Sequence, residues 1–161
     1  MVNNVKITQE IKIQLAKTCF NETWDYIEKL DKLKPWEKEM MIAAAHTSRF
    51  FWGQVGKPIN YQRGEWILTH VYSLLKRGEP ALHHAKECWN LTEKENIKDF
   101  DLAFAHEGLA RAYALNKDVE NAKIEYLLAK EAAKSIKNTE DKDYFMEELE
   151  KGPWFGFEKD S

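Results

Sequence analysis

The chain has 161 residues, with 24 Lys and Arg against 27 Asp and Glu, which leaves a formal net charge of -3 at pH 7. This balance, without a long basic block, excludes nucleic acid as the main partner. Hydrophobic residues make up 43% of the chain and aromatic residues 12%, a composition that excludes disorder and can fill a helical core. We expect a single domain over residues 1–161.

The N-terminal residues do not resemble a secretory signal, because they have neither a compact basic start nor a continuous apolar stretch. The longest clearly apolar run, residues 40–45, is far shorter than the ~20 residues that span a bilayer. We therefore expect a cytoplasmic protein that does not enter a membrane.

Apolar residues recur at helical spacing along the chain, and no segment alternates as a half-buried strand does, so the fold class is predicted to be all-α. The first helix starts after Thr8, a typical N-cap residue, and ends before Pro35. The second covers about residues 36–55 and is apolar on two faces, which predicts a central position between neighbours. The loop at residues 56–58 is expected to close it.

Two helical hairpins and a final helix follow. The third helix is expected at about 60–76, and the fourth begins after Gly78 with Pro80 in its first turn. The fifth covers about 100–115 and the sixth starts at Val119 and reaches residue 136; in each hairpin the connecting turn is short, so the helices should pack antiparallel. The last helix, about 140–149, is apolar on one side and acidic elsewhere, which is typical of the cap of a stack.

The two hairpins share a pattern of residues. Tyr72 precedes Ala81 by nine positions, and Tyr113 precedes Ala122 by nine. A leucine and a small residue stand four and three positions before each tyrosine. Small residues at these positions let two helices cross closely, so the pattern predicts an internal repeat.

These residues resemble the tetratricopeptide repeat (TPR), and the chain is similar to uncharacterised bacterial helical-repeat proteins. The resemblance implies a right-handed α-solenoid of about seven antiparallel helices. We divide it into an atypical helix pair (1–57), two TPR-like hairpins (58–98 and 99–137) and a capping helix with an aromatic tail (138–161). The copies lie 41 residues apart rather than the ~34 typical of the family, which predicts an extended helix or loop around residues 93–99.

The resemblance also implies that the first helix of each hairpin faces a concave groove, with the second helix of the chain adding to its wall. The candidate binding residues are His46, Arg49, Trp52, Arg63, Trp66, His70, Glu107 and Arg111. Arginine pairs bidentately with carboxylates and tryptophan gives rigid contact area, a combination suited to an extended peptide or a chain terminus. In the alternative interpretation Trp66 is a core residue, Arg63 and Glu107 form an ordinary ion pair, and His46 is a structural histidine.

No motif of catalysis or metal binding accompanies these residues. His83 and Glu87 are one turn apart and could share a ligand, but a solvated pair on a helix face explains them equally well. We expect no cofactor, metal or catalytic residue, and a non-catalytic module that binds a peptide or protein partner. The alternative is a small-ligand-binding or metal-assisted hydrolytic enzyme that uses the His, Glu and Arg residues of the same groove.

The C-terminal tail contains three aromatic residues within a turn-rich segment: Trp154, Phe155 and Phe157. An exposed aromatic patch of this kind would be adhesive, so we expect the tail to dock. It is expected to fold back on its own chain, and the alternative is a homo-oligomer in which the tail crosses to a neighbouring subunit.

Overall fold

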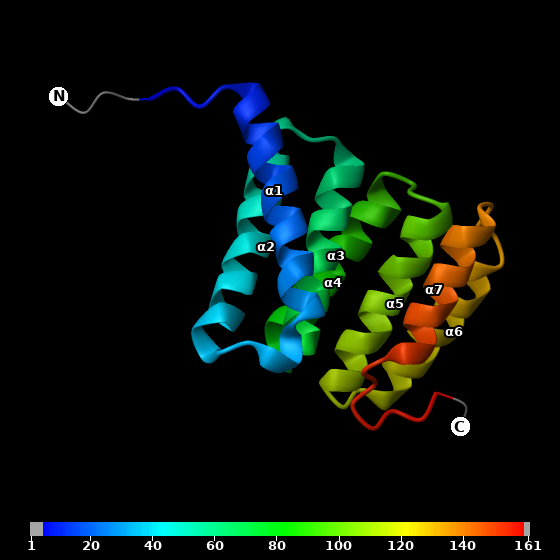
Figure 1. The fold of residues 1–161 in the computed structure, drawn as a ribbon. Coiled ribbons are helices and arrows are strands. Elements are labelled where there is room, and N and C mark those ends of the chain that lie inside the picture. Colours follow the sequence, from blue (N-terminus) through cyan, green and yellow to red (C-terminus); the bar gives the residue numbers. More distant parts are fainter. Residues whose placement is uncertain (1–4, 160–161) are drawn as a thin grey trace.

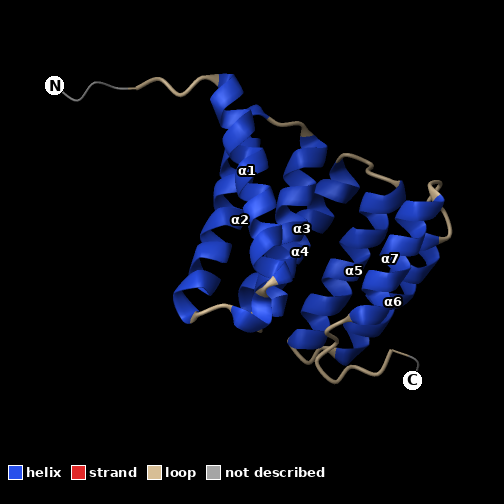
Figure 2. Cartoon of the chain, viewed as in Figure 1, coloured by secondary structure: helices blue, strands red, loops and turns tan. Residues whose placement is uncertain are grey.

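The computed structural model describes residues 5–159 and shows a row of helices packed side by side (Figure 1). Within these residues the chain forms seven α-helices and one short 3-10 turn, η1, with no strand (Figure 2). The all-helical prediction is thus confirmed. The elements are α1 (Gln9–Glu28), η1 (Leu30–Lys32), α2 (Pro35–Val55), α3 (Pro58–Leu74), α4 (Gly78–Lys94), α5 (Asp99–Leu115), α6 (Val119–Ala133) and α7 (Thr139–Lys151).

Several helix ends follow from local chemistry. The side chain of Thr8 accepts a hydrogen bond from the amide of Ile11 at 3.3 Å, which confirms its role as the N-cap of α1. Pro35 and Pro58 are the first residues of α2 and α3, so the expectation that Pro58 belongs to a closing loop is wrong. Proline fits the first helical position because its φ is preset and that position needs no amide donor.

The helices form two layers. Each helix packs against the next along the chain, and α3 also contacts α5, which in turn contacts α7. In the described chain, α2, α4 and α6 contact one another less than α3, α5 and α7 do. Among the odd-numbered helices, α3, α5 and α7 are therefore joined more closely than the even-numbered helices are.

The turns of the two central hairpins have the same backbone structure. Lys76 and Lys117 lie in the left-handed region, with φ of 58° and 64°. In each turn the next amide donates to the carbonyl of the tyrosine five positions earlier, at 2.9 Å for Arg77 and 3.0 Å for Asp118. This is the Schellman arrangement, which satisfies carbonyl groups at a helix C-terminus.

The 41-residue interval between the hairpins contains no long loop. Both α3 and α4 are 17 residues long, and only short turns connect them to each other and to α5. Ala81 and Ala85 of α4 are buried against Leu109 and Ala112 of α5. These small side chains let α4 and α5 approach closely.

The tail folds back on its own chain, as expected from the sequence. Trp154 and Phe157 are buried and pack against Tyr126 of α6. The indole N–H of Trp154 donates to the carbonyl of Leu149 at 2.9 Å. The tail thus closes one end of the core formed by α5, α6 and α7. Among the described helices, none is both long and apolar enough to cross a membrane.

Candidate functional site

A pocket of about 440 Å³ lies on the layer of odd-numbered helices. We call it the aromatic pocket, because six of its ten lining residues are aromatic. Every one of its lining residues comes from α1, α3, α5 or α7, so the stacking of these helices alone builds it. The lining residues are Phe20, Trp24, Gln62, Arg63, Trp66, Phe100, Asp101, Phe104, Asp141 and Tyr144.

The aromatic rings form a floor and two walls. Phe104 is the floor: it is 6% exposed and meets the Trp66 ring edge to face at 5.0 Å. Trp24 and Trp66 stack at 6.1 Å on one side, and Phe100 and Tyr144 stack at 6.4 Å on the other. The helices α1, α3, α5 and α7 thus each contribute at least one aromatic ring to the lining of the pocket.

Three charged side chains line the aromatic pocket. Arg63 donates through Nε and Nη2 to the two carboxylate oxygens of Asp101, at 2.8 and 2.9 Å. This hydrogen bond raises the pKa of Arg63; burial opposes the rise, and the charges of Asp101 and Asp141 add to it. Asp141 is exposed at the rim, and its carboxylate has no hydrogen bond or ion pair with the described residues. The lining therefore has one more negative charge than positive.

A second pocket of about 300 Å³ adjoins the first, and we call it the side pocket. The two pockets share Phe20 and Arg63. The side pocket is also lined by Lys17 of α1 and Trp52 of α2. Together the pockets form a groove with an acidic aromatic part and a basic part on either side of Arg63.

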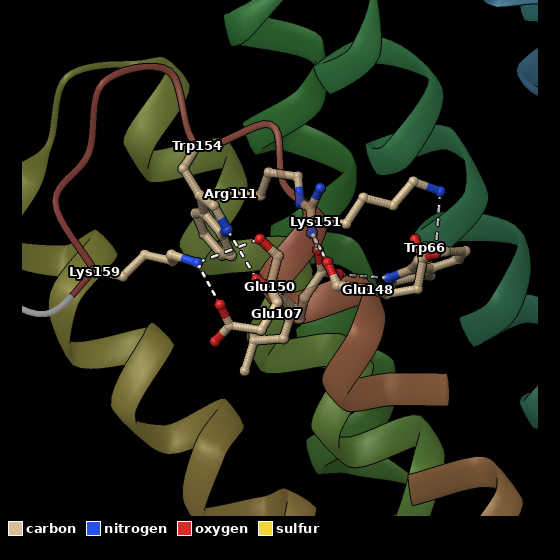
Figure 3. Close-up of polar contacts among 9 residues, drawn as sticks. Trp66, Glu107, Arg111, Glu148, Glu150, Lys151, Trp154 and Lys159 are labelled. Atoms are coloured by element: carbon tan, nitrogen blue, oxygen red, sulfur yellow. Dashed lines mark hydrogen bonds and ion pairs between the residues drawn. The ribbon is translucent and has the colours of Figure 1, made fainter. Parts of the chain in front are cut away.

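A buried network supports the aromatic pocket from behind (Figure 3). The indole N–H of Trp66 donates to Glu107 at 3.2 Å, and Glu107 forms an ion pair with Arg111. Arg111 also donates to the carbonyl of Glu148 at 3.2 Å and lies over the Trp154 ring at 4.9 Å. Arg111 is 1% exposed, and its Nε and Nη1 atoms have no partner among the described residues.

His70 lies next to this network. Its ring stacks on Trp66 at 5.0 Å and is tilted against Trp24 at 5.8 Å. Burial lowers the pKa of His70 to about 3, with smaller contributions from the positive charges of Arg111 and Lys151. His70 is therefore neutral in the folded protein at physiological pH and holds the Trp66 ring in place.

A separate polar cluster lies between α2, α3 and α4. Glu65 accepts a hydrogen bond from Arg49 Nε at 2.8 Å, and its other oxygen lies 2.7 Å from His84 Nδ1. Burial raises the pKa of Glu65, but its hydrogen bonds and charge interactions with His84 and Arg49 outweigh burial, so the pKa is lowered overall. His46 Nε2 lies 2.8 Å from the hydroxyl of Tyr72.

The eight residues predicted for the groove fall into three places. Arg63 and Trp66 line the aromatic pocket, and Trp52 lines the side pocket. Three others are buried behind Trp66: His70, Glu107 and Arg111. His46 and Arg49 belong to the polar cluster and line neither pocket.

The structure decides between the predicted alternatives for three of these residues. Arg63 pairs with Asp101 and Glu107 with Arg111, so the proposed Arg63–Glu107 pair is wrong. Trp66 is half-buried and stacks on both Trp24 and His70, so it packs and lines the pocket at once.

Sequence reasoning missed most of the aromatic lining. Phe20 and Trp24 are four residues apart on α1, as are Phe100 and Phe104 on α5. Aromatic residues at this spacing share a helix face, and this signal could have identified one ring of each wall together with Phe20 and the floor residue Phe104. The carboxylate of Asp141 carries no comparable sequence signal, because acidic residues surround it in the capping helix.

No group of three or more His, Cys, Asp or Glu residues among residues 5–159 is arranged to hold a metal ion. Comparisons with family models, curated proteins and solved structures gave no match for this chain.

Proposed function

We propose that this protein is a non-catalytic, TPR-like interaction module that binds an extended peptide segment of a partner in the groove formed by the two pockets. The observation that carries the proposal is the aromatic pocket, to which four successive odd-numbered helices contribute. Binding sites of this kind are concave and mainly apolar, with a few placed polar groups. A volume of about 440 Å³ suits one or two side chains of a peptide.

The arrangement of the hairpins supports the TPR-like part of the proposal. The repeated turn geometry and the small residues between α4 and α5 are what stacked hairpins require. In such a stack each hairpin adds a helix to one continuous concave surface. We propose a right-handed superhelix, with α7 and the tail as its C-terminal cap.

Rigid aromatic side chains support binding rather than catalysis in this groove. Trp24, Trp66 and Phe104 are held by stacking, so little conformational entropy is lost when a ligand covers them. Arg63 lines both pockets, and its partner Asp101 lines the aromatic pocket. A peptide backbone crossing this pair can exchange hydrogen bonds with either side chain.

Selection from a displayed peptide library on the purified protein tests this function. We expect enriched peptides whose affinity falls at least about tenfold in Tyr144→Ala, because truncation of an aromatic side chain that dominates an interface costs about 2 kcal/mol or more. Tyr144 is 42% exposed at the pocket rim, so its removal should leave the fold intact. Isothermal titration calorimetry with a selected peptide measures the change.

The matched control is Phe50→Ala, since Phe50 is 62% exposed on α2 and lines neither pocket. This variant should bind the selected peptides as the wild type does. Equal losses in both variants, or no loss in Tyr144→Ala, would place the binding surface elsewhere and contradict the proposal.

A further inference from the structure

The charges and the rings of the aromatic pocket together restrict the ligand that it can take. This step rests on the proposed function, because it specifies which peptide side chain enters the groove. The pocket offers several aromatic faces within a single concavity of about 440 Å³. Faces of aromatic rings carry negative electrostatic potential and attract organic cations.

The rings that line the aromatic pocket are grouped around Phe104 as two stacked pairs. The Trp24–Trp66 pair and the Phe100–Tyr144 pair each stack with interplanar angles of 26° and 25°. Phe104 joins the two pairs from below, with ring centroids 5.0 Å from Trp66 and 6.1 Å from Tyr144. A group inserted above Phe104 is therefore bordered by aromatic rings on more than one side.

The fixed charges favour a cation at the same place. Arg63 is the single positive group of the lining; it pairs bidentately with Asp101 and also interacts with the charge of Asp141. Asp141 remains as an additional carboxylate at the rim.

The positive groups near the pocket are compensated by carboxylates. Arg111 lies behind Trp66 in its ion pair with Glu107. The Nζ atom of Lys151 is 3.4 Å from Glu148. Neither cation lines the aromatic pocket, so Arg63 alone faces the carboxylates of Asp101 and Asp141, and the lining keeps one excess negative charge.

We propose that the aromatic pocket binds the alkylammonium group of a lysine side chain, unmodified or methylated, on the partner peptide. The ammonium group lies above Phe104 between the two ring pairs, and the carboxylate of Asp141 faces it from the rim. The aliphatic part of the side chain contacts Trp24 and Tyr144. The neighbouring side pocket accepts the residues that flank the lysine.

Titration with a matched set of five-residue peptides tests this inference. Their central residue is lysine, trimethyl-lysine or neutral norleucine in a Gly-Ser background, and NMR follows the indole N–H signals of Trp24 and Trp66. The cationic peptides should bind at least about fivefold more tightly than the norleucine peptide, the range expected of a partly exposed cation–π site. The lysine and trimethyl-lysine arms show which form is preferred.

Asp141→Asn should weaken the cationic peptides about threefold and leave the norleucine peptide unchanged, because a rim carboxylate contributes a modest electrostatic attraction. Asp143→Asn is the matched control, as Asp143 is exposed on the same helix and does not line the pocket. Equal binding of lysine and norleucine peptides, or no binding of any, overturns the inference. If neutral peptides selected from the library still bind the groove, the proposed function stands and the cation preference alone is wrong.

Discussion

At the scale of single residues, His70 connects the core to the aromatic pocket. It is buried, and it stacks on the Trp66 ring that forms part of the pocket wall. Glu107 holds the other end of the same indole through its N–H. The tryptophan is thus fixed by a neutral ring and a carboxylate, and the orientation of the pocket wall depends on both.

Because the pKa of His70 is lowered to about 3 in the folded protein, the unfolded chain binds one more proton between that value and about 6.5. Stability should therefore be complete above pH 6.5 and fall as the pH drops, by about 2 kcal/mol at pH 5. The lowered pKa of His46 acts in the same direction. Urea unfolding at pH 7.5 and pH 5 measures this loss.

In His70→Gln the loss of stability between the two pH values should shrink by about 2 kcal/mol, because the substituted side chain does not titrate. His83→Gln removes an exposed histidine and should keep the wild-type dependence. A pH dependence that is the same in His70→Gln and wild type would mean that folding does not lower the pKa of His70.

At the scale of helices, the hairpin turns are built without glycine. Lys76 has a left-handed backbone conformation that costs a residue with a Cβ atom about 1–2 kcal/mol. Glycine avoids that cost but loses about 0.5–1 kcal/mol through the greater freedom of the unfolded chain. Lys76→Gly should therefore raise the free energy of unfolding by about 0.5–1 kcal/mol, measured by urea denaturation.

Lys76→Ala is the control for this turn, because it removes the side chain and keeps the Cβ atom, so it should give no gain. Lys117→Gly should gain less than Lys76→Gly, since Lys117 Nζ donates to the carbonyl of Phe155 at 2.8 Å. A destabilised Lys76→Gly would show that the left-handed conformation carries no strain in this turn.

The helices were predictable because periodicity and short turns are local properties of the sequence. The first residues of α2 and α3, Pro35 and Pro58, were harder to predict, because proline fits both a loop and the first position of a helix. The pocket was predicted only in part. Arg63 and Trp66 were predicted and line the pocket, whereas Phe20 of α1 and Tyr144 of α7 reach it through the stacking of helices outside the predicted repeat.

At the scale of the whole molecule, the helices contact mainly their neighbours in the stack. Stability in such an assembly is a sum of local terms and interfaces between neighbours. The tail contributes to one end of it, where Trp154 covers Arg111 and packs on Tyr126. A substitution that destabilises this end should therefore increase local unfolding only in the adjacent helices.

Trp154→Ala tests this locality. Removing a buried tryptophan costs about 3–5 kcal/mol, here with the loss of the hydrogen bond to Leu149 and of the ring that covers the Arg111 guanidinium. Native-state hydrogen exchange should show faster opening of α5, α6 and α7, while amides in α1 and α2 keep rates close to wild type. Equal acceleration along the whole chain would show instead that the seven helices unfold as one cooperative unit, and that the aromatic pocket draws its rigidity from the entire stack.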